Sequence, residues 1–214
     1  MERRDFVAIG SAGLLVTVGF SLPEKKQYVC PPCGCSEDGK TFDKPGACSA
    51  CGMALIEKPA DANSLTLIPN FLKLNDQVWT GGQPPLEVLA KLKAEGVKTV
   101  INLRPHGEHN GDAEAAKAKE LGLRYFNLPV IYNQPKPEDA DAFLKLTDEH
   151  LKDGRAFIHC AAAIRVGAFW MIRRVLRDGW EYERALEEAN KIGLRNRPHL
   201  VEFTRGYIES KRKN

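Results

Sequence analysis

Two groups of cysteines in this 214-residue chain could do chemistry, and their spacing points to two different kinds. Five of the six cysteines fall between positions 30 and 51, close enough to share one metal ion. Cys160 stands alone more than a hundred residues later. Clustered thiols favour metal binding, whereas a lone thiol in a suitable loop favours nucleophilic chemistry. The sequence therefore predicts a metal site and a separate reactive cysteine.

Cys160 follows a short apolar run, 155–159, typical of a strand, and precedes an apolar stretch, 166–172, typical of a buried helix. In parallel sheets, ligands bind beyond the carboxyl ends of strands, where the next helix offers N–H groups to an anion. A thiol there, five positions before Arg165, ionises readily and becomes a nucleophile. We expect Arg165 to clamp an oxyanion and His159 to orient the thiolate. The alternative is a buried structural cysteine beside a core histidine.

The cysteine-rich segment contains two C-x-x-C turns, Cys30 with Cys33 and Cys48 with Cys51, separated by fourteen residues. Two such turns complete a tetrahedral four-sulfur shell for Zn²⁺ with no open position. About thirty residues cannot bury a stable core, so the metal would supply much of the folding free energy. Cys35 is left over; it could compete with Cys33 but is expected to be dispensable. The alternative is a pair of disulfides.

The same segment, 28–58, resembles the heavy-metal-binding domain of copper-exporting ATPases and efflux adaptors. The matching residues are Tyr28, Cys30, Pro31, Pro45, Gly46, Cys48, Cys51, Gly52, Met53 and Leu55. Where that family has Met-His after the first proline, this chain has Pro32 and Cys33, which favours a closed zinc ribbon over an open copper site. Cu⁺ or another soft metal, with Met53 as a soft ligand, is the alternative.

Composition limits the remaining possibilities. With 43% hydrophobic and 28% charged residues, the chain has the make-up of a globular protein rather than a disordered or multi-pass membrane protein. The formal charge is only +3, and the 31 basic residues are scattered among 28 acidic ones. We therefore expect no nucleic-acid partner. The sequence indicates no oligomeric state.

The first 22 residues have the features of a targeting signal. Arg3, Arg4, Asp5 and Phe6 precede a weakly apolar run that is short for a bilayer span. This pattern resembles a bacterial twin-arginine export signal, which implies that the folded protein is exported and is periplasmic or periplasm-facing. Because no clean small-x-small cleavage site follows, the segment could remain as a membrane anchor. A short N-terminal helix packed on the domain is the alternative.

A polar stretch, 57–65, separates the cysteine ribbon from a larger domain at 66–211. There, short apolar strands alternate with amphipathic helices, which predicts an α/β fold: a mostly parallel sheet flanked by helices. The expected strands are 97–103, 123–130 and 155–159, and the expected helices are 86–95, 112–121, 137–152, 166–172, 181–191 and 199–211.

The stretch HCAAAIRVGAFW, which begins at His159, resembles the active-site loop of cysteine-dependent phosphatases. It is closer still to the phosphatase-like domain that accompanies beta-lactamase-fold hydrolases. Further matches are Gly82-Gln83-Pro84, the run from Val100 to Pro105, Leu128-Pro129-Val130 and Arg165-Val166-Gly167-Ala168 with Trp170. The resemblance implies a small anionic or phosphorylated substrate and no cofactor for this domain. It implies Cys160 as nucleophile and Arg165 as clamp, with a substrate-binding loop and rim formed by Ala161, Ala162, Ala163, Ile164, Gln83 and Arg104.

Two departures from the phosphatase pattern affect the expected activity. Only four residues separate Cys160 from Arg165, one fewer than in tyrosine phosphatases and closer to rhodanese-type sulfurtransferases. Alanine replaces the usual glycine, so a positive φ at Ala163 would cost ~1–2 kcal/mol. In addition, no acid lies at 131–134 to protonate the leaving group. The next acids are better explained as first-turn helix charges: Glu138, Asp139 and Asp141.

The leading interpretation is a tyrosine- or dual-specificity-phosphatase-like hydrolase that uses the Cys160 thiolate and turns over slowly. One alternative is a rhodanese-like sulfurtransferase that carries a persulfide on Cys160. The other is a non-catalytic metal-handling or anion-binding protein.

Overall fold

The computed structural model describes residues 26–30, 35–37, 40–58, 64–195 and 197–213. The proposed export segment, 1–22, and the proposed ligand Cys33 lie outside these ranges. Among the helices that the model describes, none is long and apolar enough to cross a membrane.

The cysteine-rich segment forms a small antiparallel sheet. β1 (Tyr28–Val29) is central and pairs with β2 (Thr41–Phe42) on one side and β3 (Ile56–Glu57) on the other. Strands of two residues bury almost no apolar surface, so this sheet needs another source of stability.

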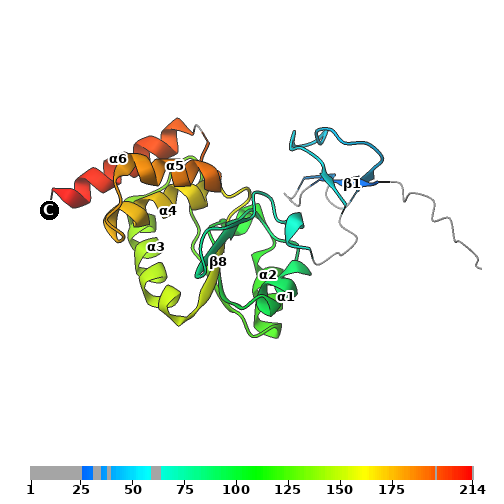
Figure 1. Cartoon of the computed structure of the whole chain (residues 1–214), viewed down its shortest axis with the longest axis horizontal. Coiled ribbons are helices and arrows are strands. Elements are labelled where there is room, and N and C mark those ends of the chain that lie inside the picture. Colours follow the sequence, from blue (N-terminus) through cyan, green and yellow to red (C-terminus); the bar gives the residue numbers. More distant parts are fainter. Residues whose placement is uncertain (1–25, 31–34, 38–39, 59–63, 196, 214) are drawn as a thin grey trace, which may run out of the picture.

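The larger domain is built on a five-stranded sheet in the order β4-β5-β8-β6-β7 (Figure 1). The strands are β4 (Leu72–Lys73), β5 (Val78–Gly81), β6 (Val97–Asn102), β7 (Arg124–Asn127) and β8 (Arg155–His159). β4 is antiparallel to β5, and all other pairs are parallel. The mostly parallel sheet is therefore confirmed. β8, which leads to Cys160, lies at its centre.

Helices cover both faces of the sheet (Figure 1). On one face, the helices are α1 (Val88–Ala94) and α2 (Gly111–Glu120). The other layer contains α3 (Pro137–His150), α4 (Ile164–Leu176), α5 (Tyr182–Ile192) and α6 (Pro198–Arg212). Three short 3₁₀ segments complete the domain: η1 (Leu65–Leu67), η2 (His106–Glu108) and η3 (Leu151–Asp153).

Alternation along β8 sends its side chains into both layers. Phe157 packs with the core under α1 and α2, whereas Ile158 and Cys160 belong to the core under α3 to α6. His159 stacks on Phe157 and so lies on the α1 and α2 side. The central strand therefore separates the two neighbouring residues of the site, His159 and Cys160, onto opposite faces of the sheet.

Candidate active site and metal centre

Cys160 lies where the sequence places it, at the carboxyl end of β8 and just before α4. Cys160 is only 1% exposed, and its backbone N–H donates to the carbonyl of Gly81 at 3.4 Å. The residue is therefore almost completely shielded from bulk water.

The loop after Cys160 is held from outside by its carbonyl groups. The carbonyl of Ala161 accepts the backbone N–H of Gln83 at 3.1 Å, and that of Ala162 accepts the Asn70 side chain at 3.0 Å. Because a trans peptide directs its N–H away from its C=O, the N–H groups of Ala162 and Ala163 lie on the side of the loop opposite to these two contacts. With the unpaired N–H groups of the first turn of α4, they form a cradle for an anion.

Ala163 closes the ring in the left-handed conformation, with φ 64° and ψ 0°, and forms the N-cap of α4. The sequence analysis gave only the cost of a positive φ at this alanine, and the structure has that conformation. It also explains a small difference from prediction: the left-handed residue turns the chain early, so α4 begins at Ile164 rather than at Val166, and Arg165 lies within its first turn.

Arg165 is 3% exposed and is gripped by Glu108. Its Nη1 donates to Oε1 at 3.0 Å and its Nη2 to Oε2 at 2.6 Å, while Nη1 also donates to the carbonyl of Val130 at 2.9 Å. Burial alone would lower the pKa of Arg165, but Glu108 and the neighbouring Cys160 raise it above its usual value. The guanidinium is thus permanently charged beside the thiol.

The way Glu108 holds Arg165 leaves one edge of the guanidinium for a ligand. A guanidinium carries five N–H donors on a planar fork, and the carboxylate occupies the edge formed by Nη1 and Nη2. Glu108 does not use the edge formed by Nε and the second Nη2 proton, and Cys160 also hydrogen-bonds the guanidinium. We infer that Glu108 fixes the direction of the clamp rather than blocking it.

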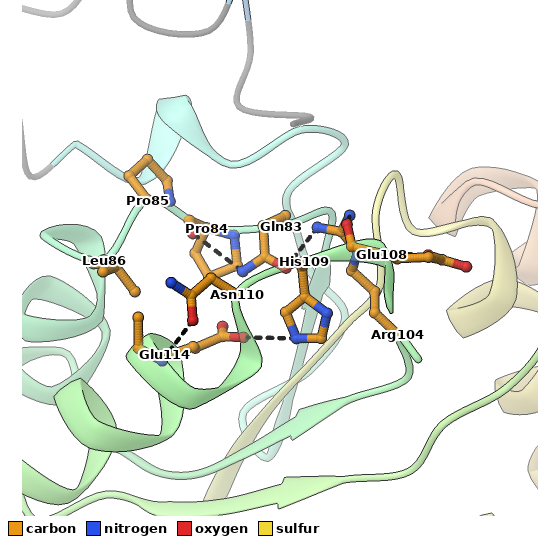
Figure 2. Close-up of a pocket in the computed structure, with 10 residues that line it drawn as sticks. Gln83, Pro84, Pro85, Leu86, Arg104, Glu108, His109, Asn110 and Glu114 are labelled. Carbon is orange, nitrogen blue, oxygen red and sulfur yellow. Dashed lines mark hydrogen bonds and ion pairs between the residues drawn. The ribbon is translucent and has the colours of Figure 1, made fainter. Parts of the chain in front are cut away.

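Gln83 and Arg104 line a cavity of about 280 Å³ beside this loop (Figure 2). Arg104 is 4% exposed, and its guanidinium donates to Gln83 Oε1 at 3.0 Å and to the carbonyl of Glu108. Both residues therefore line the same cavity, whose lining includes none of the residues from Cys160 to Arg165. The hydrogen bond between Arg104 and Gln83 holds the two side chains together in the wall of the cavity. Because Arg104 lines the cavity, it could also contact a ligand there.

His159 does not face the thiol that it was expected to orient. Its fully buried ring lies on the other side of the sheet, where Nε2 is 3.0 Å from Oε1 of Glu114. Any influence of His159 on Cys160 must therefore be electrostatic or pass through the backbone.

The acids at the start of α3 have structural partners, as expected. Asp139 accepts the backbone N–H of Lys136 at 2.9 Å, and Asp141 accepts the hydroxyl of Tyr207 at 2.6 Å. Sequence reasoning missed two other acids, Glu108 and Glu114, which the fold brings to Arg165 and His159. Glu108 lies in η2, soon after the Val100–Pro105 stretch, and Glu114 lies in the first turn of α2, and the local sequence gives no signal for either contact.

The cysteine-rich sheet gathers four sulfurs. The Sγ atoms of Cys30, Cys35, Cys48 and Cys51 all lie within 4.8 Å of one another. Three separations are 3.5 Å (Cys30–Cys51), 3.9 Å (Cys30–Cys35) and 3.9 Å (Cys35–Cys48). A tetrahedral metal with sulfur ligands at about 2.3 Å places its ligands roughly 3.8 Å apart. The four thiols therefore fit a metal.

The sequence analysis left Cys35 outside the metal shell. The structure puts it among the clustered thiols, while Cys33 lies outside the described residues. The Cys35 Sγ lies 3.9 Å from that of Cys48, in the Cys48–Cys51 knuckle, whose turn closes through Gly52 at φ 72°. Burial would raise the pKa of the Cys48 thiol, but the backbone N–H groups of Cys51 and Ala50 and the nearby thiols lower it to about 7. The cluster thus favours the thiolates that a metal binds.

Fold, loop and arginine clamp define a cysteine-dependent phosphatase-like protein. Residues 67–197 match the family model described as DSP-PTPase phosphatase fused to NAD+ kinase, and the chain belongs to that family. Residues 27–58 match the model of the heavy metal binding domain.

Curated relatives agree with this assignment. Beta-lactamase hydrolase-like proteins from Xylella fastidiosa and Agrobacterium fabrum are 29% and 28% identical over 113 and 124 residues, covering 51% and 56% of this chain. The chain spans only 26% and 28% of their lengths. The dual specificity protein phosphatase TpbA of Pseudomonas aeruginosa is 23% identical over 150 residues, which are 70% of this chain and 66% of TpbA.

Solved structures share the fold. A DUF442 protein from Shewanella putrefaciens superimposes with a TM-score of 0.57 at 24% identity, covering 68% of this chain and 95% of its own. TpbA gives 0.55 at 21% identity, with coverage of 64% and 84%. PTPMT1 gives 0.55 at 19% identity, with coverage of 67% and 99%.

Proposed function

We propose that this chain hydrolyses phosphate monoesters through a covalent intermediate on Cys160. The observation that carries the proposal is the ring from Cys160 to Arg165, whose carbonyls are held outside by Gln83 and Asn70. The inward N–H groups and Arg165 would bind the phosphoryl oxygens. The thiolate would attack phosphorus as the ester P–O bond breaks, and the leaving oxygen would take a proton from solvent or a nearby acid. Water would then cleave the S–P bond, releasing phosphate and the thiolate.

The sulfurtransferase alternative rests on the short loop alone, and the family match and the relatives favour the phosphatase. TpbA has been solved in complex with phosphotyrosine, which suggests an aryl phosphate as the first substrate to try. One experiment compares turnover of an aryl phosphate with intact-protein mass after incubation with thiosulfate. The proposal requires phosphate release without a gain of one sulfur atom. A stable persulfide on Cys160 without phosphate release would contradict the proposal. The absence of both phosphate release and a persulfide would favour the non-catalytic alternative.

We further propose that the cysteine cluster holds one Zn²⁺ per chain, with Cu⁺ or another soft metal as the alternative. The support is the all-sulfur donor set and its tetrahedral spacing, which leave no position for a substrate. When bound, the ion would cross-link strands too short to form a core. Its role would be structural.

Cys35→Ser is expected to lower the metal content of the purified protein as much as Cys51→Ser, because the thiols of both residues belong to the same cluster. Elemental analysis of each variant measures this, and Cys33→Ser is the matched comparison. If Cys33→Ser releases the metal and Cys35→Ser does not, the fourth ligand is Cys33, as first expected from the C-x-x-C spacing.

We also propose that the protein is exported by the twin-arginine route and faces the periplasm. Replacing Arg3 and Arg4 together by lysine should retain the protein in the cytoplasm, because the arginine pair is the recognised feature of the signal. Cell fractionation checks this, with Arg205→Lys and Arg212→Lys as a double variant of equal charge. A periplasmic or membrane location unchanged by the first pair of substitutions would rule out this signal.

A further inference from the structure

All three non-glycine residues with positive φ in the described part of the chain lie in the Cys160 loop or beside it. They are Asn70 (φ 50°), Ala163 (φ 64°) and Arg195 (φ 32°). Left-handed backbone is costly for a residue with a Cβ atom and persists only where the surrounding structure enforces it, which happens most often at functional sites. Asn70 and Arg195 are 125 positions apart in the sequence, yet their side chains are hydrogen-bonded to each other.

The side-chain amide of Asn70 connects these segments. Its Nδ2 donates to the carbonyl of Ala162 at 3.0 Å, and its Oδ1 accepts Nη2 of Arg195 at 3.3 Å. A carbonyl can only accept and a guanidinium can only donate, so the two contacts fix which end of the amide faces each partner. A carboxylate in the same place would lack the donor that Ala162 needs.

The backbone around Asn70 brings its amide to the loop. A backbone hydrogen bond of 3.3 Å closes the turn 68–71, in which Pro69 is second and Asn70 third. Proline followed by a residue at positive φ is the type II pattern, which favours glycine or asparagine at the third position. The carbonyl of Pro69 accepts the N–H of Gly82 at 2.6 Å, which anchors the turn just after β5. Because glycine would also satisfy this turn, the asparagine side chain is required only for the contacts that it makes.

The contact with Asn70 lies directly before the left-handed turn of the loop. Ala162 provides the carbonyl, and the next residue, Ala163, takes the conformation from which α4 starts. The N–H of Gly167 makes the first hydrogen bond of the helix, to the carbonyl of Ala163 at 3.0 Å. The N–H groups of residues 164–166 therefore have no partner within the helix. The direction of these donors depends on the conformation of Ala163.

We propose that Asn70 is a positioning residue of the phosphatase site, which holds the 162–163 peptide so that Ala163 stays left-handed and the start of α4 faces the anion. Without the amide, rotation of this peptide would return Ala163 to the negative φ that alanine prefers. The protein would then bind an anion only in the fraction of molecules that keep the turn, and its apparent affinity would fall accordingly. This inference rests on the proposed function only in taking the loop as the anion site.

The test replaces Asn70 by glycine in the full, metal-loaded chain, which keeps the type II turn and removes the amide. In ligand-free Asn70→Gly, the one-bond Cα–Hα coupling of Ala163, which reports the sign of φ, should move toward the value for negative φ. The dissociation constant for inorganic phosphate, measured by calorimetry, should rise about tenfold. The matched control is Asn75→Gly. Asn75 is another exposed turn asparagine, which accepts the N–H groups of Gln77 and Val78 at the opposite end of β5, so its loss should change neither value.

A second substitution separates positioning from direct contact with the ligand. Glycine adopts positive φ as readily as negative φ, so adding Ala163→Gly should restore most of the phosphate affinity that Asn70→Gly loses. A loss that Ala163→Gly does not recover would mean that Asn70 contacts the anion itself, and would overturn the proposal. An unchanged coupling of Ala163 in Asn70→Gly would overturn it as well.

Asn70→Asp keeps the shape of the side chain but not the donor, and it gives the same test if the glycine variant does not fold. The coupling of Ala163 is measured without a ligand, so it is independent of the proposed function. If the coupling changes as expected and the unmodified protein binds no phosphate, the role of Asn70 in the loop stands and the proposed function fails.

Discussion

Replacing Cys160 by serine should reduce aryl phosphate turnover to the background rate. A hydroxyl at this position has no general base within the ring of alanines to deprotonate it, whereas a thiol is a much stronger acid and attacks as the thiolate. Steady-state release of inorganic phosphate measures the loss.

Loss of turnover in Cys160→Ser must be separated from loss of folding. The substitution is nearly isosteric at a residue that is 1% exposed, so the thermal unfolding midpoint should change little. Binding of inorganic phosphate should persist, because Arg165 and the loop N–H groups remain. A folded serine variant with undiminished turnover would show that the activity arises elsewhere.

Arg165→Lys should lower kcat/KM for the same aryl phosphate by about 100- to 1,000-fold, the usual cost of removing a preorganised donor to a developing anion. Lysine keeps the positive charge but lacks the planar fork, so it cannot hold Glu108 on one edge and a phosphoryl group on the other.

Glu108→Gln separates two roles for the carboxylate that grips Arg165. If Glu108 aims the guanidinium, the amide variant should lower kcat, because the fork loses its charged anchor. If Glu108 instead competes with substrate, the variant should lower KM and raise kcat/KM. We expect the first result, since the carboxylate leaves the Nε edge of the fork unused. Initial rates at varied substrate concentration distinguish them.

Local sequence features were enough to locate the nucleophile. The apolar run 155–159, the thiol after it and the apolar helix beyond are consecutive in the chain, so periodicity alone places Cys160 at a strand end. The sequence also marks Ala163 as a position where a left-handed conformation would be strained, because alanine replaces the glycine usual in this loop.

The partners of the site could not be predicted in the same way. Glu108 lies 57 residues before Arg165, and they meet only because β6 pairs with β8 in the sheet. Glu114 likewise reaches His159 from another helix, and in the sequence it reads as an ordinary first-turn charge. In the ribbon, the C-x-x-C spacing gave no reason to place Cys35 near the other thiols, and the fold brings it within 4.8 Å of Cys30, Cys48 and Cys51. These contacts depend on strand order and turn geometry, which the periodicity of the local sequence does not predict.

Gly82 ties the length of the catalytic loop to a different part of the chain. It forms a β-bridge with Ala162, and a Cβ atom at Gly82 would lie 2.6 Å from the carbonyl oxygen of Ala161. A residue inserted between Cys160 and Arg165 would push a carbonyl into this backbone or break the bridge. Lengthening the loop would therefore require a matching change around Gly82, so engineers who graft a five-residue loop here must transplant both segments together.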